Sequence, residues 1–237
     1  MSPCGRTRQV TIFERSIIMR IKVGQNPRSS SSVAVVSLIL CGALLSGCQS
    51  KTAHSGFLGD YSELRPSSEY KGTSEYKNPD LALADYDKFM IDPILVHFAP
   101  NAKGTAMDPA KVKKVTDYAG EQLREALSKR YQVVSAPGPG VLRLRIALTD
   151  IKKTIPAMNI LPQTKLSGVG VGGASMEAEA LDSQSGERVL AVVASGKGSF
   201  FAYKAGLESL GNAKEVIRKW AERFVERLDK AHGYTGD

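Results

Sequence analysis

The stretch ASMEAEALDSQSGERVLAVVASG, residues 174–196, decides the fold of this chain. Its middle, DSQSG, is a five-residue turn that ends in Gly186. The segments on either side have the composition of strands, so the stretch predicts a β-hairpin. Successive residues of a strand point to opposite faces of a sheet. One face of the first strand therefore carries Met176, Ala178 and Ala180, and the other face carries Glu177 and Glu179.

The strand before this hairpin is predicted by VLRLRIALTD, residues 141–150, in which apolar residues occupy every second position. Arg143 and Arg145 point to the face opposite these apolar residues. Opposite charges on neighbouring strands stabilise a solvated sheet surface, so we expect both arginines to lie near Glu177 and Glu179 in water. The two carboxylates are roughly 7 Å apart along the strand, a spacing that also suits acid–base chemistry. The solvated surface is the stronger interpretation.

Two helices are predicted, one before and one after these strands. Asp108 followed by Pro109 predicts a helix start, because aspartate accepts hydrogen bonds from free N–H groups and proline suits the first helical position. Apolar residues then recur at three- and four-residue spacing as far as Leu127. For the second helix we expect Asn212 to cap the start, with Glu215 three residues on, and an apolar stripe follows.

Two further strands are predicted, in KFMIDPILVHFAP (residues 88–100) and in residues 131–135. The expected order of elements is β-α-β-β-β-β-α. This order predicts a single α+β domain in which two helices pack on a mainly antiparallel sheet.

The N-terminal part of the chain has the layout of a secretory signal. Residues 33–45 form an apolar run of thirteen residues, preceded by basic residues and followed by small ones. As a helix this run is about 20 Å long, shorter than the ~30 Å hydrocarbon core of a bilayer. The order Leu45-Ser46-Gly47-Cys48 resembles a bacterial lipobox. That resemblance implies cleavage between Gly47 and Cys48, with a diacylglycerol on the Cys48 thiol and a further acyl chain, such as palmitate, on the freed amine.

The signal peptide is thus expected over residues 1–47, with Met19 as an alternative start. Residues 48–80 are rich in Ser, Lys, Glu and Gly, and we expect a lipidated N-terminus and an extended tether that lies along the domain. The α+β domain is expected over residues 81–237.

Charge and cysteine content bear on nucleic-acid binding and on disulfide formation in the mature chain. The formal net charge is +8, but the leader holds six basic residues and one acidic residue, which leaves about +3. Nucleic-acid binding is therefore not indicated. Cleavage also removes Cys4 and Cys41 and leaves only the acylated Cys48, so the mature chain is expected to fold without a disulfide.

Motifs for catalysis or cofactor binding are not indicated. His54, His97 and His232 lack the spacing of metal ligands. The glycine run at residues 167–173 lacks the Lys-Ser/Thr of a phosphate loop, and a hairpin follows it in place of a helix. We expect no metal, no cofactor and no catalytic residue. The lysines of the first helix are expected to form a solvated face, with anionic lipid as an alternative contact: Lys111, Lys113 and Lys114.

Three stretches together resemble an uncharacterised bacterial lipoprotein family, the domain of unknown function 3313. They are SGFLGDYSEL (55–64), YKNPDLALADYDKFMIDPI (76–94) and MEAEALDSQSGERVLAVV (176–193). The resemblance implies a lipid-anchored envelope protein without an established activity. By resemblance to enteric sorting signals, Gln49 in place of Asp after the lipidated cysteine implies the outer membrane, with the domain facing the periplasm.

Three functions are consistent with these features. The first is a non-catalytic module that docks on another envelope protein or on a glycan. The second is an envelope hydrolase that uses Glu177 or Glu179. The third is a carrier of an apolar ligand, for which we expect a cavity between helices and sheet lined by Met176, Val192 and Trp220.

Overall fold

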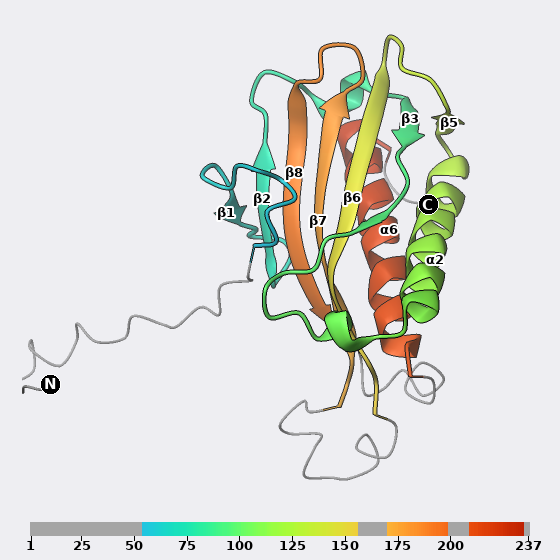
Figure 1. Cartoon of the computed structure of the whole chain (residues 1–237). Helices are drawn as coiled ribbons and strands as arrows, with labels where there is room; N and C mark the ends of the chain where they lie inside the picture. Colours follow the sequence, from blue (N-terminus) through green and yellow to red (C-terminus); the bar gives the residue numbers. More distant parts are fainter. Residues whose placement is uncertain (1–53, 156–169, 199–208, 235–237) are drawn as a thin grey trace, which may run out of the picture. The chain divides into compact units, whose positions relative to one another are not determined.

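The computed structural model describes residues 54–155, 170–198 and 209–234. Over these residues the chain forms an eight-stranded sheet and two long helices (Figure 1). The strands are β1 (Arg65–Pro66), β2 (Thr73–Lys77), β3 (Lys88–Ile91), β4 (Leu95–Val96), β5 (Gln132–Val134), β6 (Val141–Lys152), β7 (Gly173–Asp182) and β8 (Arg188–Lys197). The helices are α2 (Pro109–Ser128) and α6 (Gly211–Ala231), with the short 3-10 turns η1 (Leu83–Asp85) and η2 (Lys103–Ala106).

The sheet is mainly antiparallel. Its strand order is β1-β2-β8-β7-β6-β3-β5, and β4 pairs with β6 beyond the end of β3. The pairs from β1 to β6 are antiparallel, whereas β3 runs parallel to both β6 and β5. The long hairpin of β7 and β8 is the centre of this arrangement, as its sequence predicts, and the expected α+β fold is confirmed.

Both helices lie on one face of the sheet (Figure 1). The start of α2 is as predicted, because the Asp108 side chain accepts a hydrogen bond from the backbone N–H of Ala110 at 2.8 Å. The apolar faces of the two helices pack against β6, β7 and β3. The core residues with no measurable exposure include Phe89, Val115, Leu127, Leu142, Ile151 and Leu228.

The start of α6 differs from the prediction. The helix begins at Gly211, so Asn212 lies inside it and does not cap it. The Asn212 side chain is fully buried and donates a hydrogen bond to the carbonyl of Val171. Gly198 explains the close contact of the end of β8 with this helix turn, since a Cβ added there would collide with the Asn212 side chain. The glycines around Lys197 therefore serve packing.

The opposite face of the sheet is covered by residues 54–64, drawn in blue in Figure 1. Leu58 is the buried residue of this segment and packs against Ala191 and Val193 of β8. The chain then enters the sheet as β1 and β2, and β2 pairs with β8 over five residues. The polar composition of residues 48–80 predicts extended chain here, and two strands of the sheet, β1 and β2, are an addition to that prediction.

Two predictions fall outside the described residues. The signal peptide (1–47), its cleavage site between Gly47 and Cys48, and the lipid attachment at Cys48 precede residue 54, so they stay predictions. Among the helices of the described residues, none is both long and apolar enough to cross a bilayer.

Candidate functional site

An apolar cavity lies between α6 and the sheet, with a volume of about 130 Å³. It is lined by the three residues expected from the sequence, Met176, Val192 and Trp220. Further lining comes from β6, α2 and the rest of α6, including Leu123, Leu144, Ile146, Leu148, Ile217 and Phe224. A pocket is therefore present at the position that the hypothesis of an apolar-ligand carrier requires.

Small side chains account for this cavity. Alanines line it from both sides: Ala178 and Ala180 on β7, Ala194 on β8, and Ala119 and Ala221 on the helices. Close packing requires large and small side chains to alternate across an interface. Where methyl groups face each other, a space remains between the backbones.

The exposure of Met176 to Glu179 in β7 differs from what the sequence predicts. Met176 and Ala178 point toward the helices yet are only half-buried, because they line the cavity. Glu177 has no measurable exposure and Glu179 is 5% exposed. The predicted solvated face at the two glutamates is therefore wrong: residues 54–64 cover it.

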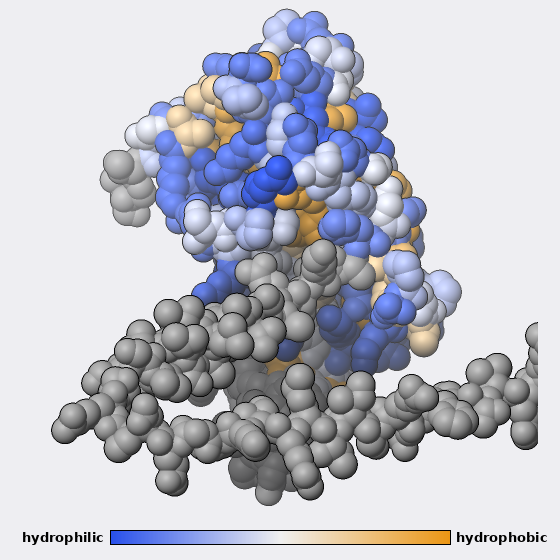
Figure 2. Space-filling view, turned by 90° about the vertical axis from the view of Figure 1, so that its left-hand side faces the viewer, coloured by the Kyte–Doolittle hydropathy of each residue, from blue (hydrophilic) through white to orange (hydrophobic). Residues whose placement is uncertain are grey.

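The rim of the cavity is cationic and aromatic. Tyr70 and Thr73 contribute to the lining from the β1–β2 side, and Arg223 and Arg227 contribute from α6. The two guanidinium groups lie 5.2 and 5.4 Å from the centre of the Tyr70 ring, at cation–π distance. From the side of the molecule drawn in Figure 2, hydrophobic surface is visible as limited patches between hydrophilic residues.

Glu177 accepts hydrogen bonds from the N-terminal segment, residues 54–64. One carboxylate oxygen accepts from the backbone N–H of Ser55 at 2.6 Å, and the other accepts from the Tyr61 hydroxyl at 2.6 Å. Burial and this hydrogen bond raise the pKa of Tyr61 above its usual value. His54 stacks on the Tyr61 ring with centroids 4.0 Å apart. The acid thus fastens residues 54–61 to the sheet.

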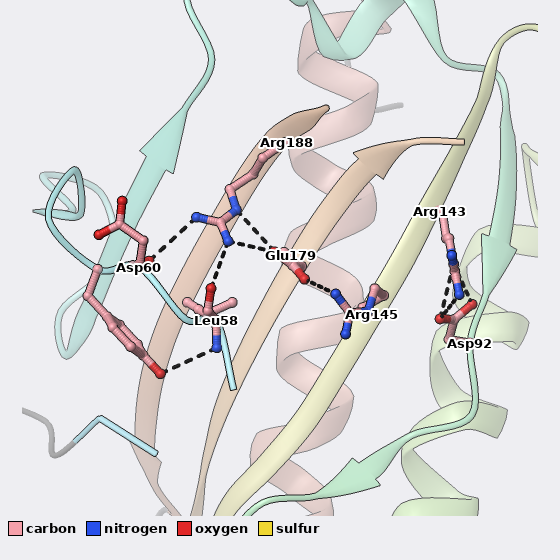
Figure 3. A network of polar contacts seen from close by, with 8 residues as sticks. Leu58, Asp60, Asp92, Arg143, Arg145, Glu179 and Arg188 are labelled. Atoms are coloured by element: carbon pink, nitrogen blue, oxygen red, sulfur yellow. Dashed lines mark hydrogen bonds and ion pairs between the residues drawn. The ribbon is translucent and has the colours of Figure 1, made fainter. Parts of the chain in front are cut away.

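Glu179 lies between two arginines (Figure 3). Arg145 Nη1 is 2.5 Å from one carboxylate oxygen, and Arg188 Nε is 3.0 Å from the other. Arg188 also donates to the carbonyls of Leu58 and Asp60, at 2.8 and 3.4 Å. The ion pair therefore links three strands and the N-terminal segment into one network.

The predicted cross-strand pairing is only partly as expected. Arg145 does lie opposite Glu179 in the sheet register. Arg143, however, forms a two-pronged ion pair with Asp92, which follows β3, and the shortest contact is 2.8 Å. The carboxylates of Glu177 and Glu179, the two candidates for acid–base chemistry, thus both accept hydrogen bonds from other residues of the chain.

The three histidines make separate contacts. His97 Nδ1 is 3.2 Å from the Ser55 hydroxyl, and His232 Nε2 is 3.1 Å from the carbonyl of Tyr86. Within the described ranges, no group of three or more His, Cys, Asp or Glu is arranged to hold a metal ion. Of the glycine run at 167–173, residues 170–173 are described, and β7 of the predicted hairpin begins at Gly173.

Comparison with known proteins identifies the family. Residues 53–224 match the model of the family described as protein of unknown function (DUF3313), and the chain belongs to this family. The uncharacterized lipoprotein YdcL of Escherichia coli (strain K12) is 26% identical over 212 residues, which cover 80% of this chain and 93% of YdcL. The resemblance noted in the sequence is thereby confirmed, and the chain is assigned to the envelope lipoproteins of unknown function.

Solved structures show weaker likeness. The PelC dodecamer from Paraburkholderia phytofirmans is 15% identical with a TM-score of 0.38, over 63% of this chain and 96% of that one. A putative lipoprotein from Caulobacter crescentus CB15 is 12% identical with a TM-score of 0.29, over 65% of this chain and 95% of that one. Likenesses of this degree carry no information on ligand or assembly.

Proposed function

We propose that this lipoprotein is a non-catalytic envelope protein that binds an apolar ligand in the cavity between α6 and the sheet. The observation that carries the proposal is the cavity itself, with half-buried Ile146, Met176 and Val192 on the sheet side. Removing apolar surface from water gains about 25 cal/mol per Å². Contact with these side chains would therefore favour binding of an apolar ligand.

The size of the cavity limits what enters it. A cavity of roughly 150 Å³ lined by Leu, Ile and Phe binds benzene. A cavity of about 130 Å³ therefore suits one ring or a short alkyl segment, with the remainder of a longer ligand outside. The proposed ligand is a small apolar molecule or the end of a chain.

The non-catalytic role is supported by the contacts of the two candidate acids. Glu177 and Glu179 accept hydrogen bonds from four donor residues of the chain and lie beneath the N-terminal segment. A general acid or base must reach the substrate, and these carboxylates reach only protein. Docking on an envelope protein or a glycan, expected from the sequence, stays a prediction.

The anchor belongs to the proposal as well. We expect Cys48 to carry the lipid and to hold the domain on the periplasmic side of the outer membrane. Mass analysis of the protein extracted from membranes would show the acyl groups on Cys48, and membrane fractionation would locate it. A cytosolic, unacylated chain would contradict this part of the proposal.

The chain contains a single tryptophan, Trp220, and it lines the cavity. Its fluorescence therefore reports on occupancy. We expect 8-bromo-1-octanol to quench Trp220 with saturation in the full chain reconstituted in phosphatidylcholine nanodiscs. Ala178→Leu, which fills the cavity, should abolish the saturable part. Ala110→Leu makes the same change on an exposed position of α2 and should leave it intact. Equal quenching of all three chains would overturn the proposal.

A further inference from the structure

We infer that the ligand of this cavity is an acyl chain that ends in an anionic group, with Arg223 of α6 as the group that recognises the anion. The inference rests on the proposed function, because it needs the apolar part of the ligand in the cavity. It adds a chemical class that the apolar lining alone does not define. The charged residues at the rim of the cavity support this inference.

Among the two arginines at the rim, Arg223 is the one whose charge is not paired with a carboxylate of the described residues. Arg227, its neighbour one turn on, is neutralised by Glu75, with Nη2 2.5 Å from the carboxylate. The side chains of that pair are 13% and 14% exposed. Arg223 is exposed, lines the cavity, and has no carboxylate within 4.0 Å among the described residues.

The nearby acids are already paired. Glu69 is 2.7 Å from Lys230, which also approaches Glu226 at 3.7 Å. Glu222 is 2.5 Å from Arg218, one turn earlier on the same helix. Each of these acids thus has a lysine or arginine other than Arg223 within 4.0 Å, and Arg223 lines the cavity without such a partner among the described residues.

Tyr70 holds this guanidinium in place. The centre of its ring lies 5.2 Å from Arg223 and 5.4 Å from Arg227, so the ring attracts both cations. A planar guanidinium held in this way presents paired N–H donors, which match the two oxygens of a carboxylate or a phosphate. Carboxylate and phosphate share this chemistry, and the experiment below separates them.

The interior of the cavity fits the chain end of such a ligand. The carboxylate of Glu179, the acid among the lining residues, points to the other face of the sheet and is held there by Arg145 and Arg188 (Figure 3). The lining that remains toward the ligand is aliphatic and aromatic. An apolar tail and an anionic head therefore meet two distinct parts of one site.

The test compares ligands that differ only in the head group. Quenching of Trp220 by 8-bromooctanoate, 8-bromooctyl phosphate and 8-bromo-1-octanol is measured with the full chain in phosphatidylcholine nanodiscs at low salt. We expect at least one anion to bind about five-fold tighter than the alcohol, as suits an exposed charge pair. The preferred anion identifies a fatty acid or a phosphate ester as the source.

The matched variants are Arg223→Gln and Arg124→Gln, the second on an exposed arginine of α2 away from the cavity. Arg223→Gln should remove the preference for the anion and leave alcohol binding unchanged, whereas Arg124→Gln should keep both. Each ligand partitions into the lipid equally with every variant, so comparing the ratio between ligands across the variants cancels the effect of partition. A preference that survives in Arg223→Gln, or no preference in the natural chain, overturns this inference while alcohol binding upholds the proposed function. Absence of saturable quenching by every ligand overturns both.

Discussion

The ion pair at Glu179 makes a quantitative prediction about stability. Glu179→Gln keeps the volume of the side chain, so it creates no cavity, but it removes the charge shared by Arg145 and Arg188. Breaking a buried ion pair from one side costs about 3–5 kcal/mol, because the partner charge stays in an apolar setting. Here the arginine side chains are 38% and 27% exposed and can turn partly to water. We therefore expect a smaller loss, about 2 kcal/mol.

Asp92→Asn is the matched control for this substitution. It makes the same carboxylate-to-amide change at a two-pronged arginine pair, but the Arg143 side chain is 44% exposed. Exposed pairs contribute about 0.2–1 kcal/mol. Urea unfolding followed by circular dichroism gives both free energies of unfolding. A loss in Glu179→Gln no larger than in Asp92→Asn would refute the reasoning that burial beneath residues 54–64 strengthens this network.

The N-terminal segment and the hairpin turn give three further predictions. Tyr61→Phe removes the hydroxyl donor of Glu177 and should lower the free energy of unfolding by about 1–2 kcal/mol, measured in urea. Leu58→Ala, at a residue 5% exposed, should cost about 2–4 kcal/mol in the same assay; a loss below about 0.5 kcal/mol would mean that the segment is not packed. A backbone N–H of Ser185 holds the pKa of Asp182 below its usual value of 3.8. The stability from this carboxylate is present above about pH 4 and is lost as the pH falls through its lower folded pKa. The loss of free energy of unfolding caused by Asp182→Asn at neutral pH should therefore become smaller on acidification. A loss that is the same at every pH would contradict this prediction.

Local periodicity was sufficient to predict the hairpin, both helices and the α+β class. The alternation in residues 141–150 and the apolar faces of α2 and α6 report directly on which side of each element is buried. The cavity at Met176, Val192 and Trp220 was predictable for the same reason, since all three lie on inward faces. Whether the inward faces of helices and sheet pack tightly depends on which of their alanines lie opposite one another. That arrangement is set by the three-dimensional structure and cannot be read from the sequence of any one element.

The burial of Glu177 could not be predicted in this way. Its cover comes from Ser55, which is 122 residues away in the chain. The stretch TSEYK of β2 also has no apolar period of its own, and it becomes a strand because β8 supplies a partner edge. The polar residues of β7 therefore indicated a solvent-exposed face, whereas in the fold residues 54–64 cover that face of the sheet.

The chain contacts the folded domain from His54 and Ser55 onward, only a few residues after Cys48. This limits how far the domain can lie from a lipid attached to Cys48. His54 already stacks on Tyr61, so about six peptide units separate the sulfur of Cys48 from the folded body, and these extend at most about 20 Å. If Cys48 is acylated as proposed, the folded domain would stay within about 20 Å of the lipid head groups and would not reach across the periplasm. Its encounters would then be restricted to molecules that diffuse in or against the same leaflet.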